Sequence, residues 1–516
     1  MTRLTHKTLK SILVLSTGLA ILAVLPAPIP SEAMAQTKAQ TQTHTQAQTQ
    51  AAARSLSPAQ VRDDVALARG AYEDIHPGYT RFADKAELDA AWDGIVARAE
   101  AQGSLSESEF YLAVSETLAL IRCDHTKAEL SRAMKKNRKT APVYLPLRWT
   151  VVENRAVILD APDGGPVMAG DEILSIDGRT VAELQAALHR YIPVDGYNDH
   201  VREEGMAASL ELMGGAVDHF GALLWDVPAQ AVLELESADG QRRTATLDRV
   251  GHDDWTAINV SDSGLNFPDS VSLTPVGSRG AVLRIDTFVN YRNPVDPDTI
   301  YAPIFERLRA EGRDRLVLDL RRNGGGSTDA SQGLFAYLID APRRLSTAQI
   351  MRTLDHSAYE DHISTWDKRA INPNRLGFRK TETGEYALRG RFSDDTDRIK
   401  PARGAFDGEL TVLTGRSNSS ASTTLISGLR AARDVTLIGE RTGGNPAGPT
   451  AGSIFFLKLP ESGLTLRLPI FRYVNNSGDV VDGVGLDPDI DAPTTVESLR
   501  AGTDPALDAA IARMRD

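Results

Sequence analysis

The sequence has a single cysteine, Cys123, in a chain of 516 residues. One cysteine excludes an intramolecular disulfide and any metal site built from several cysteines. The ten histidines are scattered, and no two are spaced as His-x-x-x-His, so we expect no bound metal ion and no cofactor. A block of basic residues is also missing. The 57 Lys and Arg against 69 Asp and Glu give a formal net charge of −12, which argues against a nucleic-acid partner.

Long apolar runs are absent as well. The most apolar stretch, residues 11–25, is shorter than the ~20 residues that a membrane-spanning helix needs. Three basic residues precede it, and Ala33-Met34-Ala35 follows. This order is typical of a secretory signal peptide. We therefore predict that residues 1–35 are removed during export to the periplasm or the exterior, leaving no membrane span; an uncleaved anchor is the alternative.

The rest of the chain divides into segments of different pattern. Residues 36–54, rich in Gln, Thr and Ala, predict a linker without fixed structure. Residues 55–141 carry helical stripes, and residues 142–252 carry short strands, an Asp-Gly turn and a helical insert. From 270 to 512, apolar strands alternate with helices, which predicts a sheet buried on both faces. We expect the charge-rich residues 343–406 to be a surface insertion over this core, with a lid as its candidate role.

Ser419 and Ser420 stand where a predicted buried strand gives way to a helix. Free backbone amides and the helix dipole favour negative charge at such a helix start. A serine nucleophile and the oxyanion of an acyl transfer would be stabilised there. The alternative is a simple cap, which is the commoner role of a serine at a helix start.

Three other segments carry candidate groups. Residues 323–326, Asn-Gly-Gly-Gly, follow an apolar strand, and their glycines let backbone amides approach a ligand; a flexible turn is the alternative. His125 follows the helix that ends near residue 121, although a lone histidine is more often a surface or packed residue. Asp482 lies in a turn-rich run that, taken alone, is only a loop.

Together and in this order, these segments resemble the C-terminal processing (tail-specific) family of serine peptidases. Residues 319–326 resemble its Asp-Leu-Arg-x-Asn-x-Gly-Gly element, and Ser420-Ala421-Ser422 resembles its nucleophile motif. Residues 439–444 and 488–490 resemble later landmarks, and residues 170–178 resemble part of a PDZ module. The resemblance implies an α/β fold with a ClpP/crotonase-like protease core, a PDZ-like module and an N-terminal helical domain.

One departure from the family bears on the mechanism. Its bacterial processing enzymes place a lysine base shortly after the Gly-Glu-x-Thr element, where this chain has Gly443-Gly444-Asn445-Pro446. Lys458 lies further on, in an apolar strand. The tricorn-like branch uses a histidine that precedes the PDZ-like region, and His125-Thr126 matches that position. Asp124 stands where that branch usually has glycine or serine.

The resemblance to this branch therefore implies Ser420 as the nucleophile and His125 as the general base. A serine hydroxyl needs such a base, and histidine suits this near neutral pH. Asp482 matches the branch's acid and would orient the imidazole, through Asp124 or another bridging residue. Ser419 remains the rival nucleophile, because the register of the double serine stays open.

The oxyanion would be bound by the amide of Ala421 and one from Gly325 or Gly326. The implied function is an exported serine peptidase that hydrolyses polypeptides through an acyl-enzyme, with a PDZ-like module that could engage the substrate's C-terminal tail. The alternative is a catalytically inactive peptide-binding or scaffold protein on the same fold.

Overall fold

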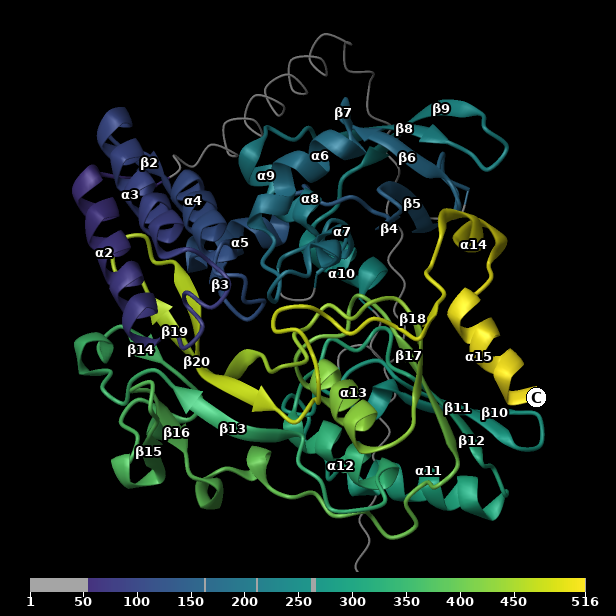
Figure 1. Cartoon of the computed structure of the whole chain (residues 1–516). Helices are drawn as coiled ribbons and strands as arrows, with labels where there is room; N and C mark the ends of the chain where they lie inside the picture. Colours follow the sequence, from purple (N-terminus) through teal and green to yellow (C-terminus); the bar gives the residue numbers. More distant parts are fainter. Residues whose placement is uncertain (1–53, 162–163, 210–211, 261–265, 516) are drawn as a thin grey trace, which may run out of the picture. The chain divides into compact units, whose positions relative to one another are not determined.

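The computed structural model describes residues 54–161, 164–209, 212–260 and 266–515. The predicted signal peptide and almost all of the predicted linker lie outside the described residues. Within the described part, no helix combines the length and the apolar character that a bilayer span requires. Figure 1 shows the arrangement of the helices and strands, coloured from purple near the N-terminus to yellow at the C-terminus.

Helices dominate the first described segment, as the sequence predicts. They are α2 (Pro58–Ile75), α3 (Lys85–Gln102), α4 (Glu107–Ala119) and α5 (Arg132–Thr140). Ser57 caps α2 and Ser106 caps α4, each in a capping box with the residue three positions on. Two short strands pair beside them, β1 (Ser55–Leu56) and β2 (Leu105–Ser106). A third, β3 (Lys127–Glu129), instead joins a sheet formed by the C-terminal half.

A small antiparallel sheet follows, in the order β4-β5-β6-β8-β9, with β7 paired to β6. Its strands are β4 (Arg148–Val152), β5 (Arg155–Asp160), β6 (Glu172–Ile176), β7 (Arg179–Thr180), β8 (Gln230–Glu236) and β9 (Arg242–Asp248). Asp177 and Gly178 have φ values of 51° and 76°, so the predicted Asp-Gly turn joins β6 to β7. We call residues 148–259 the small-sheet module.

The predicted helical insert of this module is a series of short helices. After α6 (Val181–Leu188) come η1 (His189–Tyr191), η2 (Asp199–Val201), α7 (Arg202–Gly205), α8 (Ala216–His219) and α9 (Gly221–Leu224). The helix α10 (His252–Asn259) ends the module.

The predicted buried sheet has the order β10-β11-β12-β17-β18-β21. Its strands are β10 (Val271–Val276, preceded by η4, Pro268–Ser270), β11 (Gly280–Ile285), β12 (Arg315–Asp319), β17 (Glu409–Thr414), β18 (Thr436–Gly439) and β21 (Ile490–Asp491). The strands from β11 to β21 are parallel, and β10 is an antiparallel edge strand. We call this sheet the core sheet.

Both faces of the core sheet are covered, as its continuous apolar strands predict. Leu316 and Leu318 of β12 lie in a cluster with side chains of α11 (Asp298–Ala310), α12 (Thr328–Leu338) and α13 (Ser420–Ala432). Val317, between them, lies in a separate cluster with α15 (Pro505–Arg515). Figure 1 accordingly shows β17 and β18 between α13 and α15. The remaining helix, α14 (Val496–Ala501), packs against β5.

Residues 343–406 differ from the prediction. They supply β13 (Ser346–Met351), β14 (Ile363–Ser364), β15 (Phe378–Lys380) and β16 (Tyr386–Leu388) to a second sheet of seven strands. The long hairpin of that sheet is β19 (Thr450–Lys458) and β20 (Thr465–Asn475), and β13 lies between β20 and β16. The prediction of a surface insertion is therefore wrong for β13, which buries Ile350 and Met351 inside the fold.

The rest of this segment is mostly turns and short 3-10 helices. These are η5 (Ser357–Tyr359), η6 (Lys368–Ala370), η7 (Arg375–Gly377), η8 (Gly390–Phe392) and η9 (Asp394–Thr396).

The N-terminal helices, the small-sheet module and the second sheet share one core instead of packing separately. A single cluster of buried apolar side chains includes Trp92 of α3, Leu233 of β8 and Leu468 of β20. Residues 54–516 form one compact unit by their contacts. The N-terminal helices, the small-sheet module and the second sheet therefore support one another.

Candidate active site

Three loops meet at one edge of the core sheet, because neighbouring parallel strands end on the same side. Asp319 of β12 is opposite Leu413 of β17, and Thr414 of β17 is opposite Gly439 of β18. The glycine loop after β12, the double serine after β17 and the loop after β18 therefore lie together. This is the edge that the sequence predicts to carry the chemistry.

Ser420 is the first residue of α13 and has a φ of 49°, a left-handed conformation that few residues other than glycine adopt. The conformation costs an L-residue about 1–2 kcal/mol. Such strained residues cluster at functional sites. The preceding Ser419 is extended, with a φ of −141°. Because the backbone conformation changes between the two serines, their hydroxyl groups point to different partners.

His125 lies in the loop between α4 and β3, and its neighbours fix that loop. Thr126 is fully buried, and its Oγ1 is 3.0 Å from Nε2 of His76. The thiol of Cys123 donates to the carbonyl of Thr450, the first residue of β19, at 3.4 Å. The pairing of β3 with β20 then carries this loop to the C-terminal half.

The fold brings the predicted serine and histidine together. Nε2 of His125 lies 3.3 Å from Oγ of Ser420, across 295 positions of sequence. A catalytic hydrogen bond spans about 2.6–3.2 Å and is often longer in a ligand-free site. The geometry therefore suits proton transfer from the hydroxyl of Ser420 to the imidazole.

The carboxylate beside the imidazole belongs to Asp124. Its Oδ1 is 2.5 Å from Nδ1 of His125, an ion-pair contact without the angles of a hydrogen bond. Its Oδ2 accepts a hydrogen bond from the hydroxyl of Ser419. Ser419 thus holds Asp124, while Ser420 faces the imidazole.

Asp482 does not take the place predicted for it. Arg81 contacts both of its carboxylate oxygens, at 3.0 and 2.5 Å, and Nδ2 of Asn445 donates to Oδ1 at 2.8 Å. Its side chain is about half exposed, at 51%. Because an arginine already neutralises this carboxylate and Asp124 contacts the imidazole directly, the structure corrects the assignment of Asp482 as the orienting acid.

Backbone amides for an oxyanion are present at the start of α13. In the part of the chain that the structure describes, the amide of Ala421 has no acceptor. Gly325, with a φ of 102°, packs against it, since a Cβ on Gly325 would lie 3.0 Å from that nitrogen and 2.9 Å from Cβ of Ser420. The amide of Gly325, however, donates to Oδ1 of Asn323 at 2.9 Å.

The sequence leaves Gly325 and Gly326 as alternative second donors to the oxyanion, and the structure favours Gly326. The amide of Gly325 is engaged by its own loop, and the contribution of Gly325 is the lack of a side chain where Ser420 packs. The amide of Gly326 has no acceptor among the described residues. Ala421 and Gly326 are the predicted donors that the structure leaves available.

The contact between Asp124 and His125 shifts the pKa of both groups. Burial lowers the pKa of His125, but the negative charge of Asp124 outweighs this and raises it to about 10. Burial raises the pKa of Asp124, but the charge of His125 and hydrogen bonds hold it well below its usual range. At neutral pH the resting site is thus an imidazolium–carboxylate pair, and the base form of His125 appears as the pH rises.

Two other chemistries find less support here. Potential metal-ligand atoms of Cys123, Asp124 and His125 lie within 4.8 Å of one another, but these groups are engaged with Thr450, Ser419 and Ser420. Lys458 is exposed at the far end of β19, eight residues of strand from Thr450, or about 26 Å at ~3.3 Å per residue. A lysine base at Lys458 is therefore ruled out by position.

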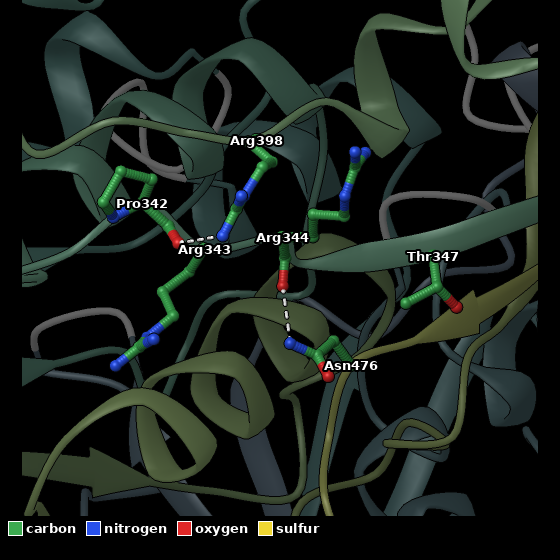
Figure 2. A pocket seen from close by; sticks show the side chains of 6 residues that line it. All are labelled: Pro342, Arg343, Arg344, Thr347, Arg398 and Asn476. Carbon is green, nitrogen blue, oxygen red and sulfur yellow. Dashed lines mark hydrogen bonds between the residues drawn. The ribbon is translucent and has the colours of Figure 1, made fainter.

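The hollow of Figure 2 lies away from these residues. It measures about 390 Å³ and is lined by Pro342, Arg343, Arg344, Thr347, Arg398 and Asn476. None of the candidate catalytic residues lines it, and its three guanidinium groups point in different directions. It is therefore not the candidate active site.

Two residues beside the site were not predicted from the sequence. Arg81, after α2, pairs with Asp482. Asp195, in the insert of the small-sheet module, is buried and accepts a hydrogen bond from the amide of Asn445 at 2.9 Å. Neither stands in a recognisable motif, so only the folded chain could reveal them.

Comparison with known families adds to this geometry. The model of peptidase family S41 matches residues 279–492. The chain carries a peptidase family S41 domain. The match confirms the predicted resemblance to C-terminal processing serine peptidases and the predicted class of enzyme, a serine-type peptidase. The S41 domain includes the glycine loop and both serines, whereas His125 lies before it in the sequence.

Solved structures of CPAF share the fold over most of the chain. Mature CPAF complexed with lactacystin is 17% identical, with a TM-score of 0.60 over 88% of this chain and 98% of that chain. A CPAF point mutant is 16% identical, with a TM-score of 0.61 over 87% and 96% of the two chains. The likeness therefore extends well beyond the S41 domain.

Proposed function

We propose that this S41 peptidase hydrolyses peptide bonds with Ser420 as its nucleophile and His125 as its general base, in the manner of the histidine-using, tricorn-like branch. The observation that carries the proposal is the 3.3 Å approach of Nε2 of His125 to Oγ of Ser420. The strained backbone of Ser420 and the available amide of Ala421 support the same reading.

The mechanism follows from these positions. As Oγ of Ser420 attacks the carbonyl carbon of a peptide bond, its proton passes to Nε2 of His125. The carbonyl oxygen becomes an oxyanion that the amides of Ala421 and Gly326 can bind, each worth roughly 3–4 kcal/mol. His125 then protonates the leaving amine, and a water molecule activated by the same imidazole hydrolyses the acyl-enzyme.

Asp124 supports this cycle and also limits it. Its charge stabilises the imidazolium that forms when His125 takes the proton. The same charge keeps the resting histidine protonated at neutral pH, because it raises the pKa of His125 to about 10. The proposed peptidase is therefore most active in alkaline buffer.

A serine-directed fluorophosphonate probe tests the nucleophile without knowledge of the natural substrate. We expect the purified mature chain to be labelled at pH 9, and Ser420→Ala to abolish the labelling. Ser419→Ala is the matched control, and we expect it to remain labelled, although more slowly, because the hydroxyl of Ser419 donates to Asp124 and does not face the imidazole. Labelling that persists in Ser420→Ala and disappears in Ser419→Ala would assign the nucleophile to Ser419.

The base is tested by a second pair of variants. We expect His125→Ala to abolish labelling and the cleavage of an unfolded polypeptide, while Lys458→Ala leaves both unchanged. If the unaltered chain is neither labelled nor able to cleave at any pH between 6 and 10, it is an inactive peptide-binding or scaffold protein on this fold.

We also propose that the protein is exported. The basic, apolar and small residues of positions 1–35 support export with cleavage after Ala35. N-terminal sequencing of the protein from culture medium and cell envelope checks this.

The antiparallel small-sheet module supports a PDZ-like role in engaging substrate chain ends. Deleting the substrate's last residues would then raise KM without changing kcat.

A further inference from the structure

One segment of the small-sheet module contacts the histidine loop, the loop that carries Asp482 and the loop that precedes Ser420. We call residues 195–205 the clamp segment. The amide of Gly196 donates to the carbonyl of Arg122, in the histidine loop, at 2.9 Å. The amide of Tyr197 donates to the carbonyl of Gly483 at 2.7 Å. Glu203, in α7, pairs with Arg416 at 2.7 Å, four positions before Ser420.

Asp195 begins this segment and lies closest to the chemistry. Its side chain is only 3% exposed, and its Oδ2 accepts the amide hydrogen of Asn445 at 2.9 Å. The neighbouring Gly444 abuts the double serine, since a Cβ on Gly444 would lie 2.8 Å from Cα of Ser419. The carboxyl of Asp195 is thus fixed just across one loop from the Ser419–Asp124 hydrogen bond.

We propose that Asp195 is a positioning residue of this site, and that its carboxyl group sets the charge on the imidazole of His125 through Asp124. The inference rests on the proposed function, because it assigns a role in the same proton transfer. No motif of the S41 domain includes Asp195, which lies before residue 279.

The physical reason is that two carboxyl groups share one buried region. Burial raises the pKa of Asp195, and the negative charge of Asp124 raises it further, to about 7. The hydrogen bond from Asn445 and the positive charges of His125 and Arg81 act in the opposite direction. Below about pH 7 the two acids therefore hold one proton between them, mostly on Asp195, and above that pH Asp195 is mostly ionised.

The charge on Asp195 affects the protonation of His125. When Asp195 ionises, it adds a second negative charge near the imidazole and keeps His125 protonated to a higher pH. When His125 accepts the proton of Ser420, its positive charge in turn stabilises the ionised carboxylate of Asp195.

Other charged and titratable groups also face this region, and substitution of Asp195 leaves all of them in place. They are His76 and Arg81 from α2 and its following loop, Arg122, Cys123 and Lys127 from the histidine loop and β3, Asp199 from the clamp segment, and Asp482 through Asn445.

The test is the pH dependence of fluorophosphonate labelling in the mature chain and in Asp195→Asn. Asparagine keeps an oxygen that accepts the amide hydrogen of Asn445, but it cannot ionise. The acid limb of the rate profile is the pH range over which the labelling rate rises as His125 loses its proton. We expect this limb to move to lower pH by about half a unit or more in Asp195→Asn, because a nearby negative charge has been removed. We expect the plateau rate to stay within about threefold of the unaltered chain's.

Asp199→Asn is the matched control. Asp199 lies in the same segment, its side chain is 54% exposed, and it pairs with Arg122 and Arg202. We expect its acid limb to coincide with that of the unaltered chain. Asp195→Ser removes the carboxyl without adding bulk, and it replaces Asp195→Asn if thermal melting shows that the asparagine variant does not fold.

The outcomes separate the two proposals. No labelling of the unaltered chain at any pH contradicts the proposed function itself. Labelling of the unaltered chain with an acid limb that Asp195→Asn and Asp195→Ser leave in place overturns the role of Asp195. A uniform loss of rate at every pH, without movement of the limb, would also overturn it, because a merely structural residue behaves in that way.

Discussion

The ion pair between Asp124 and His125 makes the strongest prediction about this protein, since it fixes the pH at which the proposed base becomes available. With the pKa of His125 raised to about 10, only about one imidazole in a thousand is neutral at pH 7. The base form increases about tenfold per pH unit until the pKa is approached. Fluorophosphonate labelling at pH 9 should therefore be about 100-fold faster than at pH 7.

Asp124→Asn is the informative perturbation. An asparagine at this position cannot carry the charge that lies 2.5 Å from the imidazole, while the burial that lowers the pKa of His125 remains. The acid limb should therefore fall by more than two pH units, to about the ordinary histidine value of 6.5 or below. We expect the plateau rate to fall at least tenfold, because the imidazolium formed during attack loses its counter-charge.

The assay is the second-order rate of labelling at half-unit steps between pH 5 and 10.5, with circular dichroism confirming the fold at both ends. Asp482→Asn is the matched control, because that carboxylate is paired with Arg81 and should not set the limb. A limb near pH 6.5 in the unaltered chain that moves in Asp482→Asn and not in Asp124→Asn would refute the ion-pair reasoning and restore Asp482 as the orienting acid.

Three further predictions concern neighbouring groups. Gly325→Ala should leave a folded protein whose labelling falls at least ~100-fold, because the added Cβ would lie 3.0 Å from the oxyanion-binding amide at a φ of 102°. Ser419→Ala should slow labelling about tenfold or more, since a hydrogen bond to the charged Asp124 is worth roughly 1.5–3 kcal/mol. In urea unfolding, Leu468→Ala should cost ~2–5 kcal/mol, whereas the 74% exposed Leu376→Ala should change stability by less than ~0.5 kcal/mol.

The elements that sequence reasoning located share a strong local signal. β12 and β17 are continuous apolar strands, and α13 begins where the polar double serine meets an apolar stripe. The helix α2 has Ser57 and Pro58 at its start, an unambiguous cap. In each case a few adjacent residues determine the local structure, so the pattern could be read without knowledge of distant contacts.

The second sheet was missed because its signal is not local. Strands β14, β15 and β16 have two or three residues each, and they stand among charged residues and turns. β14 is stabilised by pairing with β19, where Ile363 lies opposite Leu457, and β16 by pairing with β13, where Ala387 lies opposite Ile350, so each depends on a partner far away in the sequence. β3 is as short, and its pairing with β20 could not be foreseen from three residues.

The candidate site divides in the same way. Ser420 and His125 could be found because each stands in a short, ordered motif. The acid that contacts His125 could not be assigned from the sequence. In the fold, Asp482 pairs with Arg81 and Asp124 pairs with His125, and nothing in their local sequence distinguishes the two. The choice between the amides of Gly325 and Gly326 stayed open for a related reason, since the side chain of Asn323 accepts the amide hydrogen of Gly325 within the same loop. Such choices depend on side-chain placement, about which spacing in a sequence says nothing.

The position of His125 outside the S41 domain has a structural consequence. The proposed nucleophile and the glycine loop come from residues 279–492, but the proposed base comes from the N-terminal helical region. The link between them is β3, which is held by the β20 strand of the second sheet, and the clamp segment, which bonds to Arg122. Because the imidazole reaches Ser420 only when these distant parts pack together, proton transfer is coupled to the fold of the whole described chain. The bond from Gly196 to Arg122 ties the histidine loop to the small-sheet module, whereas the pairing of β3 with β20 ties it to the second sheet, so the position of the proposed base depends on both.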